Sequence, residues 1–86
     1  MFFVYVLVSK VDLSTYVGFT SDLEARLKRH NAGETKSLRS KIPLVIAYYE
    51  AYRTQEMAIA REQELKKNRS AKERLFNRIF PNGPFV

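Results

Sequence analysis

Apolar and β-branched residues gather in short runs along the chain. The first run covers residues 2–8 and the second residues 15–19, with a polar connection between them. Runs rich in Val, Tyr and Phe that are joined by a short polar turn are typical of a β-hairpin. If the loop is residues 9–12, Tyr5 stands opposite Tyr16 in the antiparallel pair. Both phenol groups should then project from one face of the sheet.

A third apolar run, residues 44–49, follows Pro43. It is hydrophobic without alternation, which is typical of a strand buried on both faces, so we expect it at the centre of the sheet rather than at an edge. Residues 34–41 precede it and mix Thr, Ser, Lys and Arg without apolar periodicity. This stretch predicts an irregular loop.

Spacings of three and four residues predict helices in the rest of the chain. The first begins after Ser21, which forms a capping box with Glu24, and covers residues 22–31 before Gly33 ends it. Its core-facing stripe places two basic side chains beside two leucines: Leu23, Arg26, Leu27 and His30.

Two further helices follow the third strand. Thr54 caps a helix that reaches Lys67. The inward face of that helix consists of Ala58, Glu62 and Leu65. A capping box of Ser70 and Glu73 starts the last helix, and the Pro-Asn-Gly-Pro run at residues 81–84 ends it. Its apolar stripe consists of Leu75, Phe76, Ile79 and Phe80. The order β-β-α-β-α-α is an α/β composition of the α+β class.

The composition of the chain indicates which class of partner it binds. Fifteen Lys and Arg against nine Asp and Glu give a net charge of +6, which favours a polyanion, and nucleic acid is the commonest one. A membrane surface is the rival, but the longest apolar run is too short to span a bilayer and lacks the basic segment of a signal peptide. The absence of cysteine excludes disulfides and thiolate zinc sites. We expect one cytoplasmic domain over residues 1–86.

Five side chains in this pattern are suited to phosphodiester chemistry: Tyr5, Tyr16, Arg26, His30 and Glu62. Hydrolysis needs a base that takes a proton from water, a cation that neutralises charge on the phosphate and a group that stabilises the leaving oxygen. A lone carboxylate suits magnesium, which keeps most of its waters and uses phosphate oxygens as further ligands. A phenol holds its proton to about pH 10, so a tyrosine base requires nearby cations that lower its pKa.

Each of these residues also has a purely structural interpretation. Cross-strand tyrosines stabilise sheets by packing alone. Arg26 can extend into solvent from the helix edge, and His30 lies where a basic group interacts favourably with the helix dipole. Glu62 belongs to a charged run that forms a solvated face by default, and only its register with the apolar positions separates it from Glu64.

The same residues stand within motifs of fixed order: Val4-Tyr5, then Tyr16-Val17-Gly18, then Arg26 and His30, and then the run Ala-Arg-Glu-Gln-Glu-Leu-Lys at residues 60–66. In type, order and spacing these motifs resemble the GIY-YIG nuclease superfamily, in particular its small standalone bacterial members. The resemblance extends over nearly the whole chain. Phe3 stands where the first motif has Gly, and Val replaces Ile in both motifs. None of these differences removes a reactive atom.

The resemblance implies a three-stranded antiparallel sheet flanked by helices and a magnesium-dependent endonuclease site, with manganese as a substitute. It also implies that Glu62 holds the metal and that Arg26 contacts the scissile phosphate. Tyr5 becomes the candidate general base, Tyr16 positions the attacking water, and His30 hydrogen-bonds to a tyrosine or to the phosphate.

Basic residues outside this set are candidates for contacts with the nucleic-acid backbone. They are Lys36, Arg39, Lys41, Lys66, Lys67, Arg69 and Arg74.

Three functions stay open on the sequence alone. The first is an endonuclease that acts on DNA rather than RNA, with repair or recombination as its setting. The second is a catalytically inactive nucleic-acid-binding module of the same fold, and the third is a protein-interaction domain. Retention of the two tyrosines, Arg26 and Glu62 favours the enzyme. The substrate's structure, and whether the domain is a monomer or a homodimer, stay open.

Overall fold

The computed structural model describes residues 1–83 of the chain. Its elements are β1 (Phe2–Ser9), β2 (Thr15–Thr20), α1 (Leu23–Asn31), η1 (Lys36–Lys41), β3 (Leu44–Tyr52), α2 (Gln55–Lys67) and α3 (Arg69–Ile79). The expected α+β fold is confirmed. The loop expected at residues 34–41 was wrong in part, because Leu38 is buried and anchors the 3₁₀ helix η1 there. Pro84, the last residue of the expected terminating run, lies outside the described residues.

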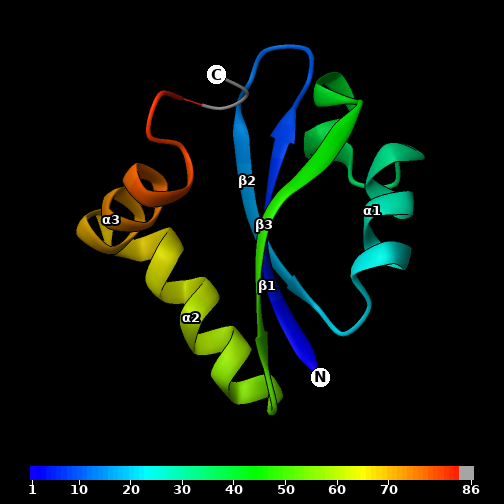
Figure 1. Ribbon diagram of the computed structural model, residues 1–86. Helices are drawn as coiled ribbons and strands as arrows, with labels where there is room; N and C mark the ends of the chain where they lie inside the picture. The colour runs from blue at the N-terminus through cyan, green and yellow to red at the C-terminus, as the bar shows by residue number, and fades with distance from the viewer. Residues whose placement is uncertain (84–86) are drawn as a thin grey trace.

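The sheet is antiparallel with the order β2-β1-β3, so β1 is its central strand (Figure 1). The prediction that β3 would be central was wrong. β3 is an edge strand whose positions are mostly half-buried or exposed, whereas β1 is buried from Val4 to Ser9. Tyrosines account for the difference, since Tyr48 and Tyr52 pack their rings on the core while Tyr49 is 55% exposed. An aromatic ring makes an edge strand look as apolar as a central one.

The register of the hairpin also differs from the expected one. Tyr5 pairs with Gly18, and Leu7 pairs with Tyr16. A shift of two residues keeps every side chain on its original face. Tyr5 and Tyr16 therefore still project from one side of the sheet, as predicted, but along a diagonal, with ring centroids 6.4 Å apart.

A longer loop causes the shift. The Ser9 hydroxyl accepts hydrogen bonds from the backbone of Val11 at 3.1 Å and of Asp12 at 3.4 Å, which keeps these residues out of the strands. Leu13 closes the loop with a φ of 62°. Pairing resumes only at Thr15.

Two of the expected helix caps lie elsewhere. α1 is capped by Asp22 rather than Ser21, and α3 by Asn68 rather than Ser70. Each capping residue has an extended backbone, and its side chain accepts a 3.0 Å hydrogen bond from the amide three residues on. Thr54 caps α2 as predicted.

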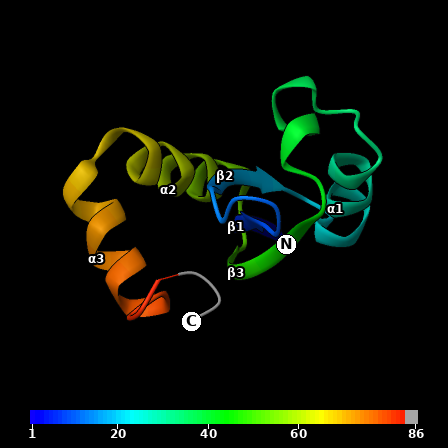
Figure 2. The same cartoon turned by 90° about the horizontal axis from the view of Figure 1, so that it is seen from above.

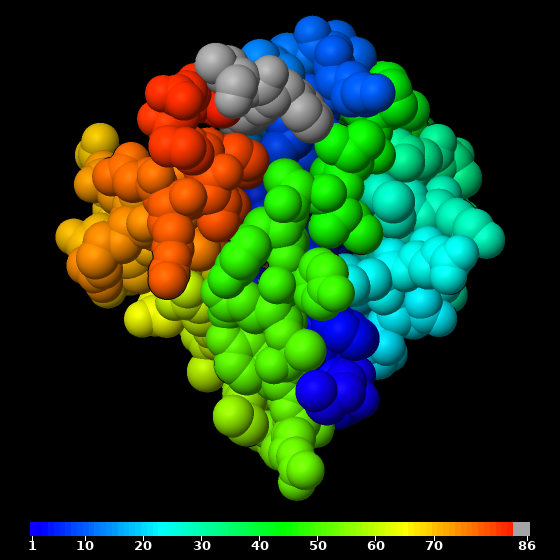
Figure 3. All heavy atoms as spheres, in the orientation of Figure 1, coloured from blue at the N-terminus to red at the C-terminus, as the bar shows by residue number. Residues whose placement is uncertain are grey.

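Helices cover both faces of the sheet (Figures 1 and 2). α2 and α3 lie on one face over a core of Val4, Val6, Val17, Ala58, Leu65 and Leu75. α1 and η1 lie on the other over Tyr5, Leu7, Leu38 and Leu44. The view onto the β3 edge shows β3 in the centre, with α3 on one side and α1 on the other (Figure 3). At the opposite edge, β2 lies between α1 and α2 (Figure 2).

Within residues 1–83, no helix is long and apolar enough to cross a membrane.

Candidate active site

A buried tyrosine and histidine meet on the α1 face of the sheet. Tyr5 is 2% exposed and His30 is fully buried. The Tyr5 hydroxyl lies 3.0 Å from Nε2 of His30, and Nδ1 of His30 lies 2.6 Å from the hydroxyl of Thr35. Both nitrogens of the imidazole are therefore held by side-chain hydroxyls within the core. The ring contacts Tyr5 and does not extend into solvent at the end of α1.

Burial sets the protonation of both rings. Burial and the neighbouring charge of Arg26 lower the pKa of His30 from its ordinary value of 6.5, so the ring is neutral at pH 7. Burial raises the pKa of Tyr5 above 10.0, and although the adjacent Arg26 guanidinium opposes this change, it does not cancel it. A phenolate base would require a lowered pKa, but the pKa of Tyr5 in the free protein is raised. Tyr5 carries its proton and can pass it only to a neighbour.

The neutral histidine predicts a pH dependence of folding. Because the pKa of His30 is lower in the folded chain than 6.5, the unfolded chain binds the proton more readily. Its contribution to stability is complete above pH 6.5 and is lost as the pH falls below that value. We expect the unfolding free energy to fall between about pH 7 and pH 5, by at most about 1.4 kcal/mol per pH unit. Urea titrations of the parent and of His30→Gln check this, and a slope that persists in the variant would assign it to another group.

Gly18 leaves the space that the Tyr5 hydroxyl occupies. A Cβ atom at this position would lie 2.5 Å from the Tyr5 oxygen and 3.1 Å from Cε1 of Tyr16. The Tyr5 hydroxyl therefore lies over Gly18 of β2, at the edge of the sheet. The half-buried Tyr16 stands beside it, 5.5 Å from the His30 ring.

Arg26 brings a positive charge to this cluster from α1. The nearby Tyr5 hydroxyl raises the pKa of Arg26, which stays charged. Within the part of the chain that the structure describes, Arg26 has no carboxylate partner, and its buried Nε has no hydrogen-bond acceptor. A buried donor without a partner in the protein is available to an oxygen from outside it, either of water or of a bound phosphate.

Glu62 reaches the same edge from α2, on the other side of the sheet. It is 8% exposed and shares its inward face with Ala58 and Leu65, as predicted. Its charge contributes to the raised pKa of Tyr5, which places the two groups within electrostatic reach. Lys66 lies 3.3 Å from Oε2 of Glu62 and 5.6 Å from the centre of the Tyr16 ring. The five candidate residues therefore converge around β2.

Comparison with known proteins decides the family. The model of the GIY-YIG catalytic domain matches residues 1–76. The chain belongs to the GIY-YIG family. It is 40% identical to a UPF0213 protein of Haloquadratum walsbyi over 65 residues, which are 74% of this chain and 72% of the relative. A UPF0213 protein of Streptococcus pyogenes is 38% identical over 74 residues, 85% of this chain and 79% of the relative.

A solved structure agrees with this assignment. The solution structure of the UPF0213 protein BH0048 from Bacillus halodurans is similar, with a TM-score of 0.55 and 30% identity. The match covers 94% of this chain and 89% of that one. GIY-YIG proteins form a superfamily of nucleases that act on nucleic acid.

The donor set of this GIY-YIG site fits magnesium. Glu62 is its carboxylate, and the described residues contain no group of three or more His, Cys, Asp or Glu side chains that could cage an ion. Gln63 donates to one Glu62 oxygen at 3.1 Å, and Lys66 pairs with the other. A single oxygen ligand is too few for a calcium or zinc cage, whereas magnesium accepts one carboxylate together with water and phosphate oxygens.

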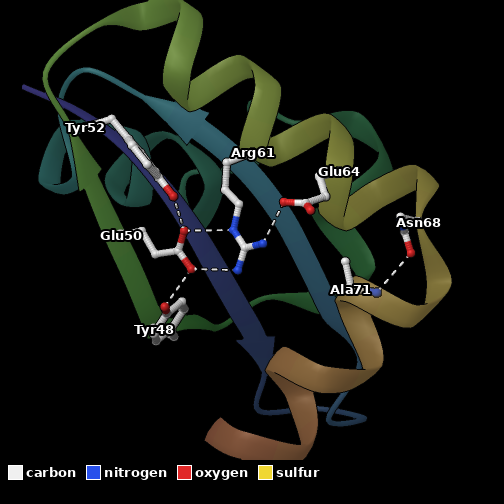
Figure 4. Close-up of polar contacts among 7 residues, drawn as sticks. All are labelled: Tyr48, Glu50, Tyr52, Arg61, Glu64, Asn68 and Ala71. Carbon is white, nitrogen blue, oxygen red and sulfur yellow. Dashed lines mark hydrogen bonds and ion pairs between the residues drawn. The ribbon is translucent and has the colours of Figure 1, made fainter.

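A clamp on the other side of α2 fixes its orientation (Figure 4). Arg61 donates to both oxygens of Glu50 on β3, at 2.9 and 3.1 Å, and Tyr48 and Tyr52 donate to the same two oxygens. Glu64 accepts a further bond from Arg61 at 2.8 Å. Burial and the Glu50 contact raise the pKa of both tyrosines to about 12, which keeps them as donors. With four donors on its two oxygens, the Glu50 carboxylate has no acceptor position left for a ligand.

This clamp positions Glu62. Successive residues of a helix point about 100° apart. Arg61 therefore points toward β3 while Glu62 points toward β2, with Leu65 between them on the core-facing side. Rotation of α2 that withdrew Glu62 from the site would also break the Arg61 contacts with β3.

The basic residues expected to hold nucleic acid fall into separate groups. The first group lies on η1, next to Thr35 and the histidine, and consists of Lys36, Arg39 and Lys41. Lys66, Lys67 and Arg69 lie where α2 meets α3. Arg74 is not brought to the β2 edge, because it lines a different groove with Arg61 and Arg78. Three of the seven are already paired within the chain: Lys41 with Asp12, Lys66 with Glu62 and Arg69 with Glu73.

Two contacts of the site were not predicted from the sequence: that of Thr35 with His30 and that of Lys66 with Glu62. Thr35 sits in a polar stretch with no signal of its own, and only the fold brings it to His30. Lys66 was assigned to the phosphate backbone, yet its four-residue spacing from Glu62 is the signal that indicates such an ion pair.

Proposed function

We propose that this GIY-YIG protein is a magnesium-dependent endonuclease that hydrolyses phosphodiester bonds of DNA. One observation carries the proposal. A buried tyrosine–histidine pair, an arginine that has no carboxylate partner among residues 1–83 and an inward carboxylate lie on β1, α1 and α2 around the β2 edge. These are the base, the phosphate-binding cation and the metal ligand that phosphodiester hydrolysis needs.

The proton path follows from the raised pKa of Tyr5. As water attacks phosphorus, the Tyr5 oxygen accepts the water's proton, and the phenol's own proton passes across 3.0 Å to the neutral Nε2 of His30. The Nδ1–H of His30 then donates to Thr35. Tyr5 acts as a relay and His30 as the final base, so a free phenolate is never required. Tyr16, at the mouth of the cluster, orients the water.

The other residues act on the phosphate. The Arg26 guanidinium neutralises charge that grows on the phosphate oxygens, and its Nε, which has no acceptor within the described residues, supplies a donor for one of them. Glu62 would hold the magnesium ion, which when bound supplies Lewis-acid stabilisation of the leaving oxygen. Lys66 neutralises Glu62 in the free protein and keeps the buried carboxylate in place.

Incubation with labelled single-stranded, duplex, nicked and branched DNA, and with the matching RNA, tests the proposal. We expect cuts in DNA with magnesium or manganese and none with a chelator. Binding without cuts in any metal would support the inactive module instead. No affinity for nucleic acid at any salt concentration would support a protein-interaction domain.

Arg26→Ala should lower cleavage about a hundredfold or more but weaken binding in chelator less than about tenfold, because its charge is needed most in the transition state. Single-turnover rates and fluorescence anisotropy measure the two effects. Arg53→Ala removes an exposed arginine between β3 and α2 and is the matched control. Equal losses of rate and affinity in Arg26→Ala would make it an ordinary phosphate contact.

Binding should weaken steeply with salt, since each phosphate contact contributes about −0.9 to the slope of log affinity against log salt. Lys36 and Arg39 are both exposed on η1 beside the site. The double variant Lys36→Ala/Arg39→Ala should make that slope shallower by about two. An unchanged slope would remove η1 from the binding surface.

A further inference from the structure

A pocket adjoins the catalytic arginine on the side away from Glu62. It has a volume of about 410 Å³ and lies between the end of β2 and the first turns of α1. Arg26 forms part of its wall, so the pocket opens onto the position expected for the scissile phosphate. Its size falls within the range of pockets that hold small ligands, about 300–1,000 Å³.

Charged side chains of both signs line this pocket. Arg26 and Arg29 contribute positive charge, and neither forms an ion pair among residues 1–83. Asp22 contributes a carboxylate, which accepts a 3.0 Å hydrogen bond from the amide of Ala25 as the helix cap. A phosphate entering the pocket is drawn to the arginines and repelled by Asp22.

The volume of the pocket leaves room for a nucleoside beyond that phosphate. Phe19 lines it where β2 ends, while the half-buried ring of Phe19 packs against the core under α2 and α3. Thr20 exchanges two hydrogen bonds with the Asp22 backbone, at 3.1 and 3.2 Å, so the rim is rigid before any ligand binds. Among residues 1–83, the buried Nε of Arg26 has no hydrogen-bond acceptor.

We propose that this pocket is the subsite for the nucleotide next to the scissile phosphate. Arg29 binds the adjacent phosphate of the same strand. The proposal rests on the nuclease function and adds the path of the DNA strand across the site. The strand passes from Glu62, across Arg26, into the pocket. Arg29 stands three residues after Arg26, so the two guanidinium groups are neighbours on one helix face and match successive phosphates of one strand.

Titration of the isotope-labelled full chain with deoxyadenosine 5′-monophosphate in chelator, followed by NMR, tests the subsite without any cleavage. We expect amide shifts at residues 19–22 and 25–29, weaker shifts with inorganic phosphate and none with deoxyadenosine. Arg29→Ala should weaken binding roughly tenfold, the scale of a charge-assisted contact, while the exposed neighbour Lys28→Ala should not. Ala25→Leu, which fills the pocket without changing charge, should weaken it as much as Arg29→Ala.

Shifts confined to η1, or equal losses in Arg29→Ala and Lys28→Ala, would overturn the subsite. A monophosphate that maps to the pocket of a protein that cuts no DNA would contradict the nuclease function and would leave the pocket as a nucleotide-binding site without a scissile phosphate beside it. Cleavage of DNA without binding in the pocket would do the reverse.

Discussion

Glu62→Gln should abolish most of the cleavage while leaving the fold and metal-free DNA binding nearly intact. The substitution keeps size and helix propensity but removes the negative charge on which a divalent ion depends. Loss of a main electrostatic contributor costs about a hundredfold or more in rate. Single-turnover cleavage with magnesium measures that loss, and anisotropy in chelator measures binding. Binding should even tighten slightly, because Lys66 is released from its ion pair and can reach a phosphate.

The matched control lies two residues further along α2. Glu64 is exposed and pairs with Arg61 at 2.8 Å, outside the site. Glu64→Gln therefore loses one contact at the outer edge of the Glu50 clamp and should cut DNA at nearly the parental rate. If Glu62→Gln cuts as fast as the parent, or if Glu64→Gln is the impaired variant, the metal assignment is wrong.

Helix periodicity made the Glu62 position predictable. The four- and three-residue spacing from Ala58 and to Leu65 places a carboxylate on a buried face, and the structure buries all three side chains. The same reasoning placed Arg26 and His30 toward the core, because a helix fixes the direction of a side chain through nearby positions alone. The Arg61 clamp was not predictable, since its partner Glu50 lies on a strand eleven residues earlier.

Features that depend on distant contacts were not predicted. The register that sets Tyr5 over Gly18 depends on hydrogen bonds from the loop backbone to the Ser9 hydroxyl, which lengthen the loop beyond the expected four residues. The contact of His30 with Thr35 depends on the path of the chain after α1. A strand's place in the sheet order is equally non-local, so the apolar run of β3 misled the prediction of a central strand.

The observed register gives Gly18 a role that the expected register did not. Gly18 stands opposite Tyr5, and a side chain there would enter the space of the Tyr5 hydroxyl. A Cβ there would lie 2.5 Å from the Tyr5 oxygen and 2.6 Å from Cζ. The Tyr5 hydroxyl is buried and lies 3.0 Å from Nε2 of His30, so a shift of the ring away from this Cβ would disturb that contact.

Gly18→Ala should therefore lower cleavage by about a hundredfold or more, the scale of a lost acid–base group, by displacing the Tyr5 hydroxyl from His30. Overpacking should also cost roughly 1–3 kcal/mol of stability, measured by urea unfolding. Gly33→Ala is the matched control. Gly33 has a φ of 82° but only ordinary contacts around a Cβ, so alanine there should cost roughly 1–2 kcal/mol and leave the rate of the folded enzyme unchanged.

A double variant separates the displaced hydroxyl from general damage to the sheet. Tyr5→Phe removes the hydroxyl outright, so Gly18→Ala added to it should reduce the remaining cleavage little, because both changes remove the same proton relay. If the two losses multiply instead, Gly18→Ala acts through another part of the site, and the 3.1 Å approach to Tyr16 is the next candidate. Parental cleavage by Gly18→Ala alone would mean that the Tyr5 oxygen need not stay within reach of His30, and the relay would then have to be replaced by direct transfer of the water's proton to another base.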